Sequence, residues 1–308
     1  MKSEDDHSEL LPSPSHNHHR PRLNHRTVMS AAIKKLSTPT GFFIFLILSY
    51  ALGYLSHTPP DFSQSAADLH QLSRFSTQCS KAVPPPDVRQ TILGRVFNGT
   101  SPWQNFPPSH IHNMLFPDWK KGWDSENPVF GNLIRRVRPK IIIEVGTFMG
   151  ASATHMADLT KQLGLETQII CIDDFRGWPG YYDDDKSLKM VNGDSLLMYQ
   201  FMHNVAKVNA TESIMFVPFS AGTALGSLCE WGVYADLIEV DAAHDFQAAW
   251  SDINKAFKVL RPGGVLFGHD YFLAEDNFGV RRAAELFARL NGFRIQIDGE
   301  HWVMAPLH

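Results

Sequence analysis

Two short motifs combine residue types suited to metal-assisted proton transfer. Asp241 and His244 form an Asp-x-x-His motif, and His269-Asp270 follows about one strand further on. Two carboxylates that face one cleft suit a hard divalent ion such as Mg²⁺, which lowers the pKa of a bound hydroxyl. His244 is then placed as a general base, since an unshifted imidazole titrates near pH 6.5. Two alternatives stay open: the acids as helix caps, and His244 as a partner of nearby backbone.

These side chains can meet only if they stand at the same end of parallel strands. Apolar runs with strand character occur at 141–145, 168–173, 214–219, 235–241 and 265–268. Helical segments are expected at about 151–163, 195–208, 246–260 and 279–291, with a short helix after Ser220. The alternation predicts an α/β fold, a parallel sheet with helices on both faces. Segments 293–297 and 301–305 predict a final antiparallel hairpin.

The first strand leads into a glycine-rich turn. It ends near Glu144, and Gly146 and Gly150 precede a helix that begins near Ala151. Glycines let the backbone approach a ligand, and the free N–H groups of the helix point at it. Asp173 ends the second run, where Rossmann-like folds place a ribose-binding carboxylate. An ordinary strand–helix turn is the alternative.

Two resemblances follow from these motifs. The pattern Glu-x-Gly-x-x-x-Gly differs from the Gly-x-Gly-x-x-Gly of dinucleotide enzymes and resembles motif I of class I S-adenosylmethionine-dependent methyltransferases. Together with the terminal hairpin, this resemblance covers about residues 130–308. The series Asp-x-x-His, Arg-Pro-Gly-Gly and His-Asp-Tyr is similar to the macrocin O-methyltransferase and cephalosporin-hydroxylase-like branch (methyltransferase domain family 24). The whole-chain layout resembles plant membrane-anchored methyltransferase-like proteins.

The resemblance implies a Rossmann-like, seven-stranded class I methyltransferase sheet and a set of site residues. Asp241 and Asp270 become ligands of Mg²⁺, and His244 becomes the base. Glu239 and His269 are candidates for a third ligand. S-adenosylmethionine is expected to contact Glu144, Gly146, Thr147, Gly150, Ser152, Asp173 and Ser220. The implied reaction is O-methylation of a hydroxylated small molecule or glycan.

The N-terminal segments predict a membrane anchor. Residues 1–40 are polar and rich in His, Pro and Ser, which predicts a disordered cytoplasmic tail. Residues 41–56 are strongly apolar but short beside the ~20 residues of a typical span. They fit a transmembrane signal-anchor, with a cleaved signal peptide as the alternative. Basic residues upstream favour a single-pass type II protein of the Golgi or endoplasmic reticulum with a lumenal catalytic part.

Beyond the anchor, composition divides the chain further. Residues 57–90 are Pro-rich and predict a stem, and 91–139 are rich in aromatics and predict a cap over the domain at 140–308. The cap aromatics serve either packing or a substrate-binding wall. Sequons at Asn98 and Asn209 agree with a lumenal location.

Composition narrows the class of protein. The 308 residues are 44% hydrophobic and 19% charged, with a formal net charge of −4. This supports one medium domain plus extra segments and argues against nucleic-acid binding. The three cysteines are too few for a disulfide scaffold, and Cys171 and Cys229 are expected in the core.

Two other functions stay open. Asp183-Asp184-Asp185 is reminiscent of the Asp-x-Asp motif of Golgi glycosyltransferases, which bind sugar nucleotides, although acids in a polar loop are usually just solvated. A non-catalytic anchored scaffold with a methyltransferase fold is the other possibility.

Overall fold

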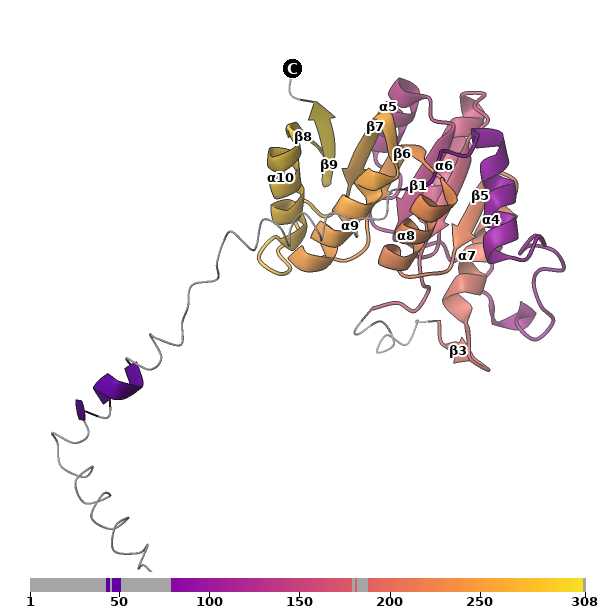
Figure 1. Ribbon diagram of the computed structural model, residues 1–308. Helices are drawn as coiled ribbons and strands as arrows, with labels where there is room; N and C mark the ends of the chain where they lie inside the picture. Colours follow the sequence, from indigo (N-terminus) through magenta and orange to yellow (C-terminus); the bar gives the residue numbers. More distant parts are fainter. Residues whose placement is uncertain (1–42, 45, 51–78, 179–180, 182–187, 307–308) are drawn as a thin grey trace, which may run out of the picture. The chain divides into compact units, whose positions relative to one another are not determined.

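The computed structural model describes residues 43–44, 46–50, 79–178, 181 and 188–306 (Figure 1). The chain divides into two compact units, Met1–Ser76 and Thr77–His308. Among the described residues, no helix has both the length and the apolar character to cross a bilayer. The expected tail, much of the expected anchor and Asp183 to Asp185 lie outside the described residues.

A seven-stranded sheet forms the centre of the second unit, in the order β5–β2–β1–β6–β7–β9–β8 (Figure 1). The parallel strands are β1 (Ile141–Val145), β2 (Gln168–Ile172), β5 (Ile214–Val217), β6 (Ala235–Val240) and β7 (Leu260–Gly268). β9 (His301–Pro306) runs antiparallel to both β7 and β8 (Phe293–Asp298). The predicted Rossmann-like sheet with its terminal hairpin is thus confirmed. A separate pair, β3 (Met190–Val191) and β4 (Asp194–Ser195), follows β2 in the chain.

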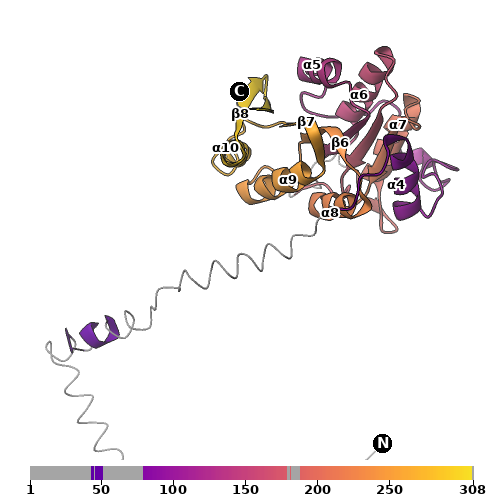
Figure 2. The ribbon, with the colours of Figure 1, turned by 45° about the horizontal axis from the view of Figure 1, so that its top comes forward.

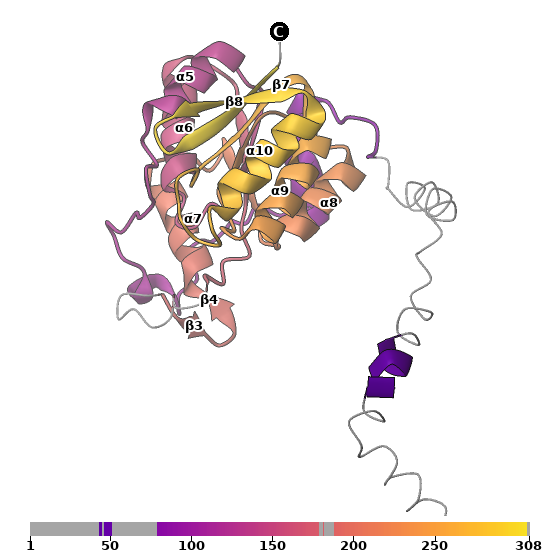
Figure 3. The same cartoon turned by 90° about the vertical axis from the view of Figure 1, so that its left-hand side faces the viewer.

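Helices cover both faces of this sheet, as Figures 2 and 3 show. One face packs against α4 (Val88–Val96), α8 (Ala221–Trp231), α9 (Phe246–Lys258) and α10 (Gly279–Asn291). The other packs against α5 (Pro128–Val137), α6 (Ala151–Gln162) and α7 (Leu196–Lys207). β1 contributes to both cores, because Ile141 and Ile143 face the first layer and Ile142 faces the second.

Helices α4 and α5 were not predicted. α4 begins inside the expected stem, and Val88 is fully buried, so the packed part of the chain begins before residue 91. α5 has a recognisable start, because the Asn127 side chain accepts a hydrogen bond from Val129 N and Pro128 occupies the first turn. Its apolar residues gather on one side and pack against β6 and α6. The helical periodicity of α5 was not recognised in the sequence, because aromatic residues occur throughout the segment 91–139.

β7 begins earlier than expected, and α9 ends earlier. The helix was expected to reach residue 260, but α9 ends at Lys258 and β7 begins at Leu260. Leu260 pairs with Ala235, and the register then shifts before Leu237 pairs with Val265. The residues that were interpreted as a helix stop therefore form an irregularity within a strand.

The cysteines also differ from expectation. Cys79 and Cys229 form a disulfide across a sequence separation of 150 residues, while Cys171 is free and buried. Cys229 is buried as predicted, but as half of a cross-link. Backbone hydrogen bonds hold the two segments side by side, with Ser80 N donating to Cys229 O at 2.9 Å. Sequence spacing does not reveal such a pairing, because it depends on which segment lies over α8.

Candidate functional site

The candidate residues gather at the carboxyl ends of the parallel strands. Val145 of β1 pairs with Val240 of β6, which in turn pairs with Gly268 of β7. The residues that follow, Asp241 and His269, therefore leave the sheet side by side. This is the edge at which open α/β sheets bind their ligands.

A glycine is required at position 146, because neighbouring protein atoms leave no room for a side chain. Its φ is +91°, and a Cβ there would lie 1.8 Å from the backbone oxygen of Asp241. Gly150, at φ +77°, precedes α6, and a Cβ there would lie 2.9 Å from the ring of Phe201. The expectation that both glycines also make room for a ligand stays a prediction. They let the turn pack against β6 and α7.

Glu144 lies beneath this turn and is fully buried. It accepts a hydrogen bond from the Ser152 hydroxyl, and burial raises the pKa of its carboxyl group. Glu144 Oε2 and the buried hydroxyl of Thr147 have no hydrogen-bond partner of good geometry in the described part of the chain. Such buried polar atoms are rare unless water or a ligand satisfies them.

Asp173 links the turn to β2. Its carboxylate accepts hydrogen bonds from Phe148 N at 2.8 Å and Phe175 N at 2.7 Å. Burial raises the pKa of Asp173. Each carboxylate oxygen keeps a lone pair for a further donor, such as a ribose hydroxyl. Ser220 is exposed, and its hydroxyl donates to the Thr223 hydroxyl at 3.0 Å.

Asp241, His269 and Asp270 come together as a possible metal site. Each offers one ligand atom, and these atoms lie within 4.8 Å of one another. The expectation that the two acids share one edge is therefore met in the geometry. His269 Nδ1 lies 3.1 Å from Asp270 Oδ1 and 3.7 Å from Asp241 Oδ1. The other candidate ligand, Glu239, is not part of this group.

The pKa values of the two acids are shifted in opposite directions. Burial raises the pKa of Asp241 to about 7. Burial also acts to raise the pKa of Asp270, but hydrogen bonds from His244 and His269 hold it below its ordinary value. Asp270 adopts a left-handed backbone, φ +61°, which turns its carboxylate between these two imidazoles. The donor set fits a divalent cation, which favours the charged form of both carboxylates.

His244 is held between two carboxylates in this arrangement. Its Nε2 lies 3.0 Å from Asp270 Oδ2, and its Nδ1 lies 2.8 Å from Glu275 Oε2. The hydrogen bond to Asp270 is the main reason that the pKa of His244 rises to about 9. This pKa favours the protonated imidazole at neutral pH, and the role of His244 as a general base stays a prediction. Loss of either carboxylate partner would lower this pKa and favour the neutral imidazole that a general base requires.

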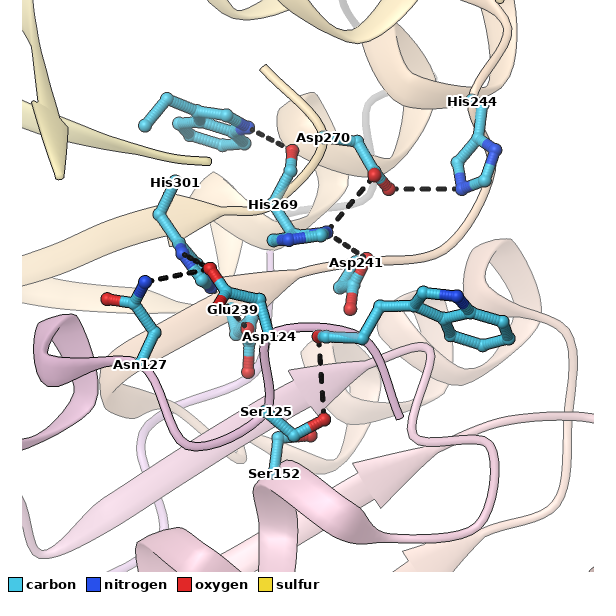
Figure 4. A network of polar contacts seen from close by, with 12 residues as sticks. Asp124, Ser125, Asn127, Ser152, Glu239, Asp241, His244, His269, Asp270 and His301 are labelled. Atoms are coloured by element: carbon cyan, nitrogen blue, oxygen red, sulfur yellow. Dashed lines mark hydrogen bonds and ion pairs between the residues drawn. The ribbon is translucent and has the colours of Figure 1, made fainter. Parts of the chain in front are cut away.

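A second polar cluster was missed by the sequence analysis (Figure 4). His301 is almost fully buried, with Nδ1 3.7 Å from Asp124 Oδ2 and Nε2 3.8 Å from Glu239 Oε1. Burial lowers the pKa of His301 to about 4 and raises that of Glu239 well above its usual value. Neither Asp124 nor His301 belongs to a motif, so no spacing pointed to them.

Aromatic side chains border the glycine-rich turn. The ring centre of Phe148 lies 5.7 Å from that of Trp123 and 5.3 Å from that of Trp178. Trp123 and Trp178 remain 53% and 47% exposed. By contrast, Trp103 packs edge-on against the buried Phe216. The aromatics of the cap thus include core residues and a partly open wall beside the turn.

Comparison with known proteins agrees with this fold. Residues 143–271 match a family described as a methyltransferase domain, a segment that runs from β1 to just beyond Asp270. This segment of the chain is therefore similar to a methyltransferase domain. The chain is 24% identical over 178 residues to the uncharacterized protein y4gI of Sinorhizobium fredii. That alignment covers 57% of this chain and 18% of the relative's length.

Solved structures with distant similarity include two O-methyltransferases. The Bacillus cereus O-methyltransferase in complex with SAH is 17% identical, covers 62% of this chain and 84% of its own, and has a TM-score of 0.42. The O-methyltransferase TomG from Streptomyces achromogenes in complex with SAM is 14% identical. It covers 77% of this chain and 95% of its own, with a TM-score of 0.44. Likeness at this level carries no information on substrate.

The close contact at Gly146 generates a prediction about stability. Gly146→Ala should lower the free energy of unfolding by about 3 kcal/mol, because a left-handed alanine costs roughly 1–2 kcal/mol and overpacking roughly 1–3 kcal/mol. Gly164→Ala is the matched control, since Gly164 also has a positive φ, +61°, with nothing within 4 Å of its Cβ position. The control should lose only about 1–2 kcal/mol. Denaturant unfolding of both variants checks this, and equal losses would contradict the contact.

Proposed function

We propose that this protein is an S-adenosylmethionine-dependent methyltransferase that transfers a methyl group to a hydroxyl oxygen. The observation that carries the proposal is the position of Asp241 and Asp270 at the ends of β6 and β7, the next two strands of the sheet beside β1 and its glycine-rich turn. A methyl donor at the turn and an acceptor at the acids would lie on the same edge of the sheet. The methyltransferase family match over residues 143–271 supports the same class.

The turn supplies the groups that a nucleoside with a charged amino-acid tail requires. S-adenosylmethionine, when bound, would supply a methyl group on a sulfonium, whose carbon an oxygen nucleophile would attack in line, with S-adenosylhomocysteine as the leaving group. Asp173 is positioned to accept hydrogen bonds from ribose hydroxyls, and the N-terminus of α6 presents free N–H groups. Thr147, whose hydroxyl has no other partner in the described structure, is suited to bind a polar group of the tail.

Asp241 and Asp270 would hold a divalent ion such as Mg²⁺, with water completing its shell. The ion supplies Lewis acidity that lowers the pKa of a coordinated hydroxyl. His244 lies next to Asp270 and is the residue placed to receive the hydroxyl proton. It reaches the neutral form needed for this role when Asp270 or Glu275 turns away.

The acceptor is a hydroxylated small molecule or glycan. Trp123 and Trp178 are exposed beside the turn and offer flat apolar surfaces. Such surfaces stack against the apolar faces of sugars and aromatic rings. Trp123 belongs to the cap aromatics, for which packing and a substrate wall were both open, and its exposure favours the substrate wall.

The same proposal places the domain in the lumen of the Golgi or endoplasmic reticulum, behind a type II signal-anchor at 41–56. The disulfide between Cys79 and Cys229 supports an oxidising compartment. Asn98 and Asn209, the two sequon asparagines, are both exposed, as glycosylation requires. The uncharged run between Lys35 and Asp61 supports the anchor.

Calorimetry of the full-length chain tests the cofactor. S-adenosylmethionine and S-adenosylhomocysteine should bind with micromolar Kd, roughly −8 kcal/mol, while NAD and UDP-sugars should not. Asp173→Asn should weaken binding about 10- to 100-fold, because hydrogen bonds to a charged group contribute roughly 1.5–3 kcal/mol. Asp174→Asn, at the exposed neighbouring position, is the control and should leave affinity unchanged.

Two other results of this titration would contradict the proposal. Binding of a UDP-sugar alone would contradict the methyltransferase proposal and indicate a glycosyltransferase. Binding of none of these ligands would favour the scaffold.

Manganese binding, measured by electron paramagnetic resonance, tests the proposed metal site at Asp241 and Asp270. Mn²⁺ stands in for Mg²⁺, and the wild-type chain should bind it in a form that excess Mg²⁺ displaces. Asp241→Asn should abolish this binding and leave S-adenosylmethionine affinity within about twofold, because the side chain of Asp241 lies beside His269 and Asp270. Glu230→Gln, an exposed acid on α8, is the control. Unchanged Mn²⁺ binding in Asp241→Asn would remove the metal from the proposal.

Endoglycosidase treatment tests the lumenal location. The protein isolated from eukaryotic cells should lose apparent mass on removal of N-glycans. Asn98→Gln combined with Asn209→Gln should abolish that shift, since both side chains are exposed. Absence of any shift in the wild-type chain would speak against a lumenal domain.

A further inference from the structure

His269 faces a second group of ligand atoms on the side away from Asp241. Asp124, His269 and His301 each offer one ligand atom, and these atoms lie within 4.8 Å of one another. The two imidazole rings are 4.7 Å apart between centres. Figure 4 shows His269 between the two groups, with Asp241 and Asp270 on one side and His301 and Asp124 on the other.

Both histidines carry a buried nitrogen without a partner. The side chains of His269 and His301 are 8% and 1% exposed. Within the described residues, His269 Nε2 and His301 Nδ1 have no hydrogen-bond partner. Burying a polar atom unpaired costs about 1–3 kcal/mol, so two such atoms in one place call for a ligand that satisfies both.

A carboxylate lies on the side of each imidazole away from its unpartnered nitrogen. His269 Nδ1 lies 3.1 Å from Asp270 Oδ1, which places the proton on Nδ1 and the lone pair on Nε2. His301 Nε2 lies 3.8 Å from Glu239 Oε1, beyond hydrogen-bond range, on the side of the ring away from the unpartnered Nδ1. Histidines that bind metals commonly donate their other N–H to a carboxylate in this way.

The spacing fits a bridging cation better than a hydrogen bond. His301 Nδ1 and Asp124 Oδ2 are 3.7 Å apart, beyond hydrogen-bond range. Two ligands bound at roughly 2.0–2.2 Å in a tetrahedral site are roughly 3.3–3.5 Å apart, so a small inward movement suffices. Asn127 Nδ2 donates to Asp124 Oδ2 at 2.7 Å and orients that carboxylate.

We propose that Asp124, His269 and His301 form a second metal site for a divalent ion that accepts nitrogen ligands, of the Zn²⁺ class. Two imidazole nitrogens and one carboxylate oxygen suit Zn²⁺, whereas Mg²⁺ prefers oxygen alone. Asp270 and Glu239 are positioning residues. The ion joins the loop before α5 to the ends of β7 and β9.

Zinc titration of the full-length chain, stripped with a chelator and then competed with a chromophoric chelator, tests the site. The wild-type chain should bind one tight Zn²⁺, and Co²⁺ in its place should show the visible bands of a four-coordinate ion. Asp124→Asn and His301→Gln should each weaken Zn²⁺ binding about 100-fold or more, because loss of even an outer partner costs about 10- to 100-fold. Asp124 is partly exposed and Asn has the same shape, so this variant should fold.

Asp241→Asn is the matched control. It removes an acid from the other side of His269, so it should leave Zn²⁺ affinity within a few-fold of wild type. The tail contains His16, His18 and His19 in every variant, so weak binding there cancels in the comparison. The melting temperature with and without Zn²⁺ should rise in the wild type and Asp241→Asn, and not in Asp124→Asn.

Three results would overturn the proposal. The first is a wild-type chain that takes up no tight Zn²⁺. The second is an Asp124→Asn variant that folds normally and binds Zn²⁺ as tightly as wild type. The third is Zn²⁺ binding that Asp241→Asn abolishes and Asp124→Asn preserves, which would assign the ion to the two acids.

Discussion

The close contact between Gly146 and the carbonyl of Asp241 determines the edge on which the candidate residues stand. Gly146 N donates to Ile172 O, and Asp241 N donates to Val145 O, both at 2.8 Å. These bonds extend the parallel ladder by one residue beyond the strands. A Cβ at position 146 would collide with the carbonyl oxygen of Asp241, so the turn packs directly against the backbone of Asp241. The proposed cofactor site and metal site share this backbone contact.

The same edge concentrates negative charge in a region of low solvent access. Burial is the main reason that the pKa values of Glu144, Glu239 and Asp241 are raised, and mutual repulsion adds to it. Buried acids must be neutralised by protons or by cations. The imidazole of His269 lies between two groups of acids. Its Nδ1 faces the carboxylates of Asp241 and Asp270, and its Nε2 faces His301 and Asp124. The ligand atoms beside Nδ1 are therefore carboxylate oxygens, whereas those beside Nε2 include the imidazole nitrogen of His301.

Much of the fold was predictable because strands and helices show their character locally. The helix expected at 279–291 has those bounds in the structure, since its apolar period ends at Gly292, which adopts a left-handed conformation. The start of β7 was not predictable in this way, because Leu260 becomes a strand residue by pairing with Ala235 of a neighbouring strand. The disulfide partner of Cys79 was hidden for a similar reason, since it lies 150 residues away.

The sequence by itself determined that Asp241 and Asp270 would meet, because residues that follow adjacent parallel strands leave the sheet at one edge. It also determined the glycine-rich turn and its acid, Asp173. Only the tertiary structure decided the environment of each group. Glu275 pairs with His244, and Asp124 meets His301, because loops from distant parts of the chain fold over the strand ends. Periodicity records which side of an element is buried, but the partner of a buried side chain depends on the packing of segments that share no local pattern.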